Sequence, residues 1–251
     1  MGFVTKILTM FRSELAGAKK VFIKPNIVSF EPYPTTTHPD VLDALLTGLS
    51  GHELIVGDGP AVDAGGSDSV LRRSPLREVC EKHNIALTNL YSEPMRRIKS
   101  PRGYSVKVSA TPLLCDYVIS VPVLKVHNML GLSGALKNQF GYLSKMDRLM
   151  MHTKIKDINK GIAEANAAAH TDLFIVDAVQ TMAGAQEQRH GGCCSDLGTM
   201  IAGKDPVSID VYGLKLLCKV EPSLKGRSNP KYVQYASEYG VGRTEYKAEE
   251  I

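Results

Sequence analysis

The residues best suited to chemistry gather in one segment, LKVHNMLGLSGALKNQFG, at residues 124–141. This segment holds the imidazole of His127 and, ten positions later, the amine of Lys137. Imidazole serves as acid, base or metal ligand near neutral pH, and a partly desolvated lysine serves as nucleophile, proton donor or cofactor anchor. We therefore predict that His127 and Lys137 are the catalytic residues of an active site.

Other residues of the same segment are suited to hold what this pair acts on. Ser133 and Asn138 offer hydrogen-bonding groups, and we predict that they bind substrate. Gly131 and Gly134 allow a positive φ or a close approach of the backbone to a bound group. Together with Lys137, these two glycines are predicted to contact a cofactor.

Further polar residues stand directly after apolar runs that resemble buried strands. Ligands of open α/β sheets bind outside the carboxyl ends of the strands, so such residues are candidates for substrate binding. They are Lys24, Asn26, Asp58, Lys125, Asp177 and Lys204. With Lys137, the lysines among them would form a cationic mouth suited to a carboxylate or a phosphate. The alternative role for each of these residues is helix capping or turn formation.

The elements that must position these residues follow from the apolar pattern. Short runs rich in Val and Ile alternate with segments of helical period, which predicts an α/β fold. We expect one domain over residues 1–251, with a mixed or mostly parallel sheet, helices on both faces and a small β-ribbon at residues 96–110. The predicted strands lie at residues 20–28, 53–58, 85–91, 116–124, 172–179 and 197–205. The predicted covering helices lie at residues 38–50, 67–82, 155–170 and 205–220.

The overall composition limits the classes of partner. The 30 basic and 26 acidic residues leave a net charge of +4, which is too balanced for a dedicated nucleic-acid protein. No apolar run approaches the ~20 residues that cross a bilayer, and the charged N-terminal stretch is typical of an amphipathic helix. We expect a small anionic molecule as partner, no nucleic acid, no membrane and a cytoplasmic location.

The five cysteines are scattered and include no CxxC pair of the kind that zinc or iron-sulfur sites use. Reduced thiols are therefore expected. Cys193 and Cys194 are adjacent in a glycine-rich loop, HGGCCSD, where they would ligate a soft metal, form a redox pair or be incidental loop residues.

Four ordered motifs carry a resemblance to a known family. KPNI near the start, LKVH followed by GALKN, then FIVDA and AGKDPVSID, together resemble the DUF362 family, an uncharacterised group. Some of its members also carry ferredoxin-type iron-sulfur modules. The resemblance implies an iron-sulfur or ferredoxin-type protein as a candidate partner, while this sequence has no ferredoxin cysteine motif of its own.

A second, more distant resemblance concerns HNMLGLSGALK, which has the spacing of His, Gly, Ser, Gly and Lys found in lactate racemase-like enzymes. In that family the lysine anchors a nickel-pincer nucleotide, and the histidine takes part in proton transfer on a 2-hydroxy acid. The resemblance assigns these roles to Lys137 and His127. A later histidine binds the nickel there, which makes His152, with His127, a candidate metal ligand. Ala135 departs from the pattern, and this chain is far shorter.

Three functions remain open from the sequence. The preferred one is an enzyme that uses His127 and Lys137 for proton transfer or cofactor anchoring on a small anionic substrate. The second is a redox or metal-associated protein that works with an iron-sulfur partner. The third is a non-catalytic module for a phosphorylated or nucleotide ligand, for which the loop GDGPAVDAGGSDSV at residues 57–70 would form a phosphate-cradling turn.

Overall fold

The structure is a computed structural model and describes residues 2–251. Its main sheet has six strands in the order β10-β9-β6-β1-β2-β3. All neighbouring strands pair in parallel except β10, which runs antiparallel to β9. The strands are β1 (Lys20–Pro25), β2 (Glu53–Asp58), β3 (Leu87–Asn89), β6 (Tyr117–Val121), β9 (Leu173–Ala183) and β10 (Cys193–Gly203). The predicted α/β fold with a mostly parallel sheet is confirmed.

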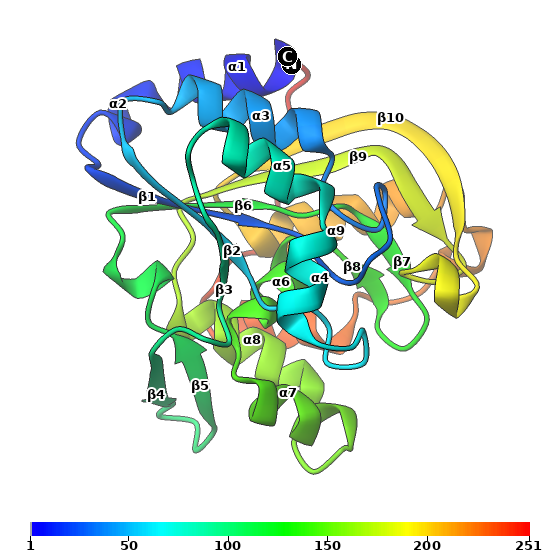
Figure 1. The fold of residues 1–251 in the computed structure, drawn as a ribbon. Helices are drawn as coiled ribbons and strands as arrows, with labels where there is room; N and C mark the ends of the chain where they lie inside the picture. The colour runs from blue at the N-terminus through cyan, green and yellow to red at the C-terminus, as the bar shows by residue number, and fades with distance from the viewer. Residues whose placement is uncertain (1) are drawn as a thin grey trace.

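Helices cover both faces of this sheet (Figure 1). One face carries α1 (Gly2–Met10), α2 (Arg12–Leu15), α3 (Pro39–Gly48), α4 (Ser67–Arg73) and α5 (Pro75–Lys82). The other carries α6 (Ala135–Asn138), α7 (Lys145–His152), α8 (Ile158–Ala168), α9 (Pro206–Leu217) and α10 (Lys231–Glu238). Short 3-10 turns are η1 (Pro112–Leu114), η2 (Gln139–Tyr142), η3 (Gln188–His190) and η4 (Pro222–Leu224). No helix within residues 2–251 is long and apolar enough to span a bilayer.

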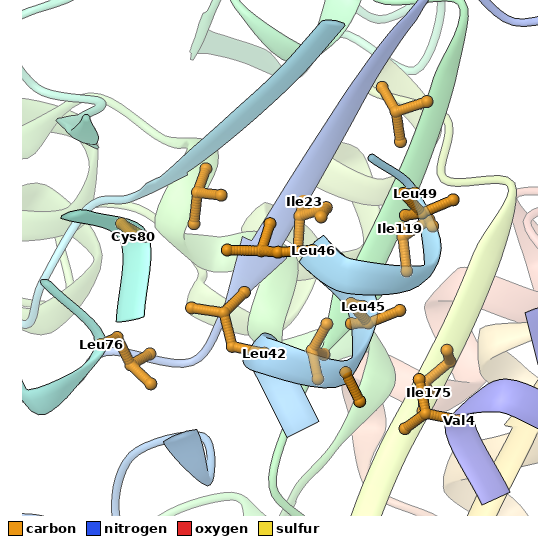
Figure 2. Close-up of a cluster of buried hydrophobic side chains, with 14 of the residues drawn as sticks. Val4, Ile23, Leu42, Leu45, Leu46, Leu49, Leu76, Cys80, Ile119 and Ile175 are labelled. Atoms are coloured by element: carbon orange, nitrogen blue, oxygen red, sulfur yellow. The ribbon is translucent and has the colours of Figure 1, made fainter. Parts of the chain in front are cut away.

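Alternation along β1 explains why both faces are covered. Val21 and Ile23 belong to the apolar cluster under α1 and α3, whereas Phe22 belongs to the cluster on the opposite face. Successive strand residues point to opposite faces, so a strand with consecutive apolar residues needs a packing layer on each side. Figure 2 shows Leu45 and Leu46 of α3 beside Ile23 and Ile119 of the sheet. Each fully buried leucine contributes about 1.5–3 kcal/mol to this layer.

The predicted ribbon is present as β4 (Met95–Lys99) and β5 (Ser105–Ser109), which pair antiparallel. Gly103 has φ +78° in the connecting turn, a conformation that favours glycine. The predicted helix at residues 67–82 is instead two helices. Ser74 separates them, because it precedes Pro75 and its hydroxyl accepts the N–H of Leu76 to cap α5.

The chemistry-bearing segment forms a hairpin that the sequence did not predict. β7 (Lys125–His127) pairs antiparallel with β8 (Gly131–Ser133) and leads directly into α6. Gly131 has φ +80° at the end of the hairpin turn. This hairpin and α6 bring His127 and Lys137 to the carboxyl end of the sheet.

Candidate active site

A cavity of about 520 Å³ opens where the carboxyl ends of β1 and β2 meet the β7–β8 hairpin. Parallel strands place their carboxyl ends at one edge, which is where ligands of open α/β sheets bind. Most of the predicted site residues line this cavity. They are Lys24, Asn26, Asp58, Lys125, His127, Ser133, Lys137, Asn138 and His152.

Four predicted site residues lie outside the cavity lining: Asp177, Gly131, Gly134 and Lys204. Asp177 is buried within β9, where its carboxylate accepts the Tyr33 hydroxyl at 3.0 Å and the Val179 N–H at 2.9 Å. Gly131 serves the hairpin turn. Gly134 precedes α6, where a Cβ atom would collide with the Asp210 carboxylate.

Lys204 does not lie with the other lysines of the predicted cationic mouth. It follows β10, whose last residue, Gly203, pairs with Phe174 near the start of β9. Because β10 is antiparallel, its end lies at the opposite edge of the sheet. Lys204 Nζ there forms an exposed ion pair with Glu14 at 2.7 Å.

Lys24 and Asp58 form a buried ion pair at the base of the cavity. Their side chains are 1% and 3% exposed, and Lys24 Nζ also donates to the Pro25 carbonyl at 3.1 Å. Asp58 accepts the N–H groups of Ile27 and Gly59, both at 2.7 Å. Burial lowers the pKa of Lys24 despite this carboxylate. The pair therefore cancels its own charge and ties β1 to β2.

Lys125 is also buried, but it faces a neutral group. Its Nζ donates to the Thr35 carbonyl at 2.6 Å, and no carboxylate of residues 2–251 forms an ion pair with it. Burial lowers the pKa of Lys125 to about 8. A positive charge without a counterion thus stands in the cavity wall for much of the Lys125 population at neutral pH.

Lys137 lies in α6 and is half-buried in the cavity lining. Its Nζ stands 4.3 Å from the centroid of the Phe140 ring and has neither an ion pair nor a hydrogen bond with the described residues. Burial lowers the pKa of Lys137 to about 7, and the charges of Arg148, Lys125 and Lys24 act in the same direction. The amine is therefore poised between its charged and neutral forms near neutral pH.

The N-terminal end of α6 rests on Asp210, a fully buried residue of α9. Its carboxylate accepts the N–H groups of Ala135 at 2.6 Å and Leu136 at 3.2 Å. Burial raises the pKa of Asp210 to about 7. Sequence reasoning missed Asp210, although a lone acid among the apolar residues of α9 was a usable signal.

Arg148 of α7 is a second residue that sequence reasoning missed. It is 6% exposed and donates to the Gly59 carbonyl and the Tyr91 hydroxyl, while its Nε is buried without a partner. Its guanidinium carbon lies 5.0 Å from the centroid of Phe140. No acidic residue of the described chain pairs with it. No signal in the sequence placed this residue beside Lys137.

His127 is 9% exposed, and its Nδ1 accepts the N–H of Met129 at 3.3 Å. Burial lowers the pKa of His127 to about 2, and the charge of Lys137 adds to the effect. The imidazole is therefore neutral at pH 7. Since Nδ1 acts as the acceptor, the single ring proton resides on Nε2. His127 is accordingly arranged as a neutral hydrogen-bond donor.

His152 ends α7 at the exposed rim of the cavity. Its ring meets Phe140 edge-on, with centroids 5.9 Å apart, so Phe140 is shared by His152 and Lys137. Partial burial lowers the pKa of His152. Within residues 2–251, no three His, Cys, Asp or Glu side chains are grouped so that they alone could hold a metal ion.

Each acidic residue of the cavity lining already forms an ion pair, and two of them share one arginine. Asp58 pairs with Lys24, and both Asp63 and Glu187 pair with Arg189. The cationic side chains of the lining that lack an ion pair among the described residues are Lys125, Lys137 and Arg148. The lining thus has an excess of positive charge.

Cys193 and Cys194 lie outside this cavity, at the start of β10. Both are exposed free thiols. Adjacent residues of a strand point to opposite faces, so these two thiols are poorly placed to chelate one ion. The predicted redox or metal role of the two cysteines has no supporting geometry in this hairpin.

Comparison with known proteins bears on the fold and the family. The structure is similar to the lactate racemase apoprotein from Thermoanaerobacterium thermosaccharolyticum, with a TM-score of 0.54 and 17% identity, covering 83% of this chain and 50% of that chain. A structural-genomics protein from Thermotoga maritima gives a TM-score of 0.44 and 14% identity, covering 88% and 58%. This chain thus spans about half the length of the racemase. At 17% identity the likeness to the racemase apoprotein shows the fold alone.

No curated protein sequence matches this chain. A family model described as a domain of unknown function, DUF362, matches residues 21–215, which include the β7–β8 hairpin, α6, α7 and Asp210. The chain therefore belongs to the DUF362 family.

Proposed function

We propose that this protein is an enzyme that binds a small carboxylate or phosphate and moves a proton with Lys137. The observation that carries the proposal is that three cations of the cavity lining, Lys125, Lys137 and Arg148, have no ion pair, while each acidic residue of the lining already has one. A buried cation without a counterion costs several kcal/mol. A bound anion would remove that cost, so the ligand is expected to carry negative charge.

The chemical roles of Lys137 and His127 follow from their protonation states at pH 7. Lys137 has a pKa of about 7, which suits both accepting and donating a proton at neutral pH. His127 offers an Nε2–H group and is too weak a base to take up a proton at pH 7. We therefore assign proton transfer to Lys137, and to His127 the stabilisation of an oxygen atom that gains negative charge.

The racemase-like fold raises the question of a nickel-pincer nucleotide. The free amine of Lys137 suits a covalent anchor, and His152 lies across the same phenyl ring as a single metal ligand. When bound, such a group would supply a metal centre for chemistry on a 2-hydroxy acid. The remaining metal donors would come from the group itself, since no cluster of three protein ligands exists among residues 2–251.

The phosphate-cradling turn predicted at residues 57–70 has less support as a binding element. Gly59 lines the cavity, but its N–H donates to Asp58 and its carbonyl accepts from Arg148. A phosphate cradle needs free N–H groups that point at the ligand. The cationic side chains are thus the better candidates for holding an anion.

Calorimetric titration with inorganic phosphate and with lactate tests the proposal. We expect wild-type protein to bind at least one of them. Removing one charged contact in Lys137→Gln should weaken binding roughly 10–100-fold, because a hydrogen bond to a charged group contributes about 1.5–3 kcal/mol. Lys204→Gln is the matched control, since Lys204 pairs with Glu14 at the far edge of the sheet.

Proton transfer is tested separately by NMR in deuterium oxide. Wild-type protein should exchange the methyl hydrogens of bound pyruvate, which lie next to its carbonyl group, with solvent deuterium, and Lys137→Gln should not. Binding without exchange would favour a non-catalytic binding module. Failure of the wild-type protein to bind phosphate or any small carboxylate would contradict the proposal.

A further inference from the structure

The amine of Lys137 differs from the other cavity lysines in what surrounds it. Lys24 is held by Asp58, and Lys125 donates to the Thr35 carbonyl. Lys137 Nζ faces the phenyl ring of Phe140 and the cavity, with no hydrogen bond or ion pair to residues 2–251. A lysine that is desolvated and placed beside other cations is a typical nucleophile towards carbonyl carbons.

The protonation state supports the same chemistry. With a pKa of about 7, roughly half of the Lys137 amines are neutral at pH 7, against roughly one in 2,500 for an ordinary lysine. Only the neutral amine has the lone pair that attacks a carbonyl carbon. Arg148 and Lys125 keep the neutral form populated, because each disfavours a further positive charge nearby.

The groups around Lys137 would also orient a carbonyl compound. His127 presents an Nε2–H, the kind of donor that polarises a carbonyl oxygen. The buried guanidinium of Arg148, with its unpartnered Nε, can hold a carboxylate beside that carbonyl. All three residues line one cavity.

We propose that Lys137 forms an imine with the carbonyl carbon of a small 2-oxo acid, whose carboxylate is held by Arg148 and whose carbonyl oxygen faces His127. This inference rests on the anion site of the proposed function and names the substrate class and the bond formed. It differs from proton transfer by a free amine, because the amine nitrogen becomes covalently joined to the substrate.

The step balances without an oxidant or reductant. The nitrogen lone pair attacks the carbonyl carbon, and the carbonyl π electrons move to oxygen, which takes up one proton as the amine loses one. The carbon–oxygen bond of this carbinolamine then breaks as the carbon–nitrogen double bond forms. Oxygen leaves as water, and its two hydrogens balance the two that the neutral amine loses.

Reductive trapping tests the imine. Wild-type protein is incubated at pH 7 with pyruvate and sodium cyanoborohydride, which delivers hydride to the imine carbon and leaves a stable secondary amine. Peptide mapping should place the reduced adduct on Lys137 at a rate roughly 100-fold above that of exposed lysines, since the neutral fraction is far larger while a weakly basic amine is less nucleophilic.

Several controls make the result specific. Lys137→Arg should abolish the adduct, and Lys204→Gln should retain it. Acetone, which has the ketone and lacks the carboxylate, should label Lys137 at least tenfold more slowly than pyruvate. Because the label is mapped on wild-type protein, a variant that fails to fold does not decide the outcome.

Equal labelling of Lys137 and exposed lysines would contradict the proposal that Lys137 forms an imine. If pyruvate still binds by calorimetry in that case, the anion site of the proposed function stands and the covalent step alone is excluded. If neither binding nor labelling is observed, the anion site and the imine are both contradicted.

Discussion

The carboxylate of Asp210 accepts the backbone N–H of Ala135 at 2.6 Å, two positions before Lys137. It thereby joins α9 to the first residue of α6 inside the core. No side chain larger than that of glycine fits at Gly134, because a Cβ there would collide with this carboxylate. Asp210 therefore positions the short helix that carries the reactive amine.

Replacing Asp210 should change both stability and its pH dependence. Asp210→Ala leaves two buried N–H groups unpaired, which should lower the unfolding free energy by about 1–3 kcal/mol each. The position of α6, and with it that of Lys137, should become less well defined. Burial raises the pKa of Asp210 to about 7, because the protonated carboxyl is favoured in the folded state. The contribution of this proton to the unfolding free energy is fully present below about pH 4 and is lost as pH rises through 7. The unfolding free energy falls by at most roughly 4 kcal/mol over this range.

Urea unfolding at pH 5 and pH 8 checks this prediction. Asp210→Asn cannot ionise, so its unfolding free energy should fall less than that of wild-type protein between the two pH values. Identical pH dependence in the two proteins would show that Asp210 does not titrate in this range in the folded state.

Breaking the Lys24–Asp58 pair should be costly, because both side chains are almost fully buried. Lys24→Met leaves the Asp58 charge unpaired and should lower the unfolding free energy by about 3–5 kcal/mol. The double variant Lys24→Met with Asp58→Asn should recover part of this loss. Chemical denaturation of wild-type protein, Lys24→Met, Asp58→Asn and the double variant completes a double-mutant cycle.

The surface pair of Lys204 and Glu14 supplies the control for that cycle. Lys204→Met should cost less than about 1 kcal/mol, as is usual for exposed ion pairs. A loss of similar size in Lys24→Met would mean that the buried pair contributes no more than a surface pair.

His127 should stay neutral over the whole range in which ordinary histidines titrate. Its depressed pKa means that the stability gained from a neutral imidazole is present above about pH 6.5 and is lost as pH falls below it. Imidazole ¹⁵N NMR should show the Nε2–H tautomer from pH 8 to pH 5. A titration near pH 6.5 would contradict the assigned tautomer.

Substitutions at His127 separate its donor role from its packing role. His127→Gln keeps an N–H donor and should retain the anion affinity, whereas His127→Phe should bind the anion roughly 2–10-fold more weakly while remaining folded. Circular dichroism confirms the fold, and calorimetry gives the affinities. Equal binding by both variants would remove His127 from the site.

The adjacent cysteines should be independent of the cavity. Burial and Asp196 raise the pKa of Cys194, so this exposed thiol should react slowly with a disulfide reagent at pH 7. Replacing both Cys193 and Cys194 by serine should leave anion affinity within twofold of wild type. Metal content after anaerobic purification gives a second readout. If the wild-type protein binds a metal and the double variant does not, Cys193 and Cys194 are metal ligands after all.

Much of the scaffold could be predicted from local patterns. The apolar run at residues 53–58 matches β2 residue for residue, and the ribbon was marked by a glycine-containing turn between two short strands. The break at Pro75 was missed because apolar residues recur at helical spacing on both sides of it. The spacing of apolar residues indicates that a helix or strand is present more reliably than it indicates where that helix or strand ends.

The site could be predicted only in part, because strand direction is not a local property. Lys24, Asp58 and Lys204 all follow apolar runs, but β10 turns back along β9 and carries Lys204 to the opposite edge. Arg148 reaches the cavity through the packing of α7, and Asp210 reaches the start of α6 through the packing of α9. Their positions depend on how the helices pack across the sheet, which short-range spacing does not encode.

The titration of the Lys137 amine, followed by side-chain NMR and assigned with Lys137→Arg, tests the anion site most directly. In anion-free buffer the midpoint should lie near pH 7. Saturating phosphate or lactate should raise it, because a bound anion favours the charged amine. A midpoint above pH 10 that neither anion changes would contradict a site built around Lys137.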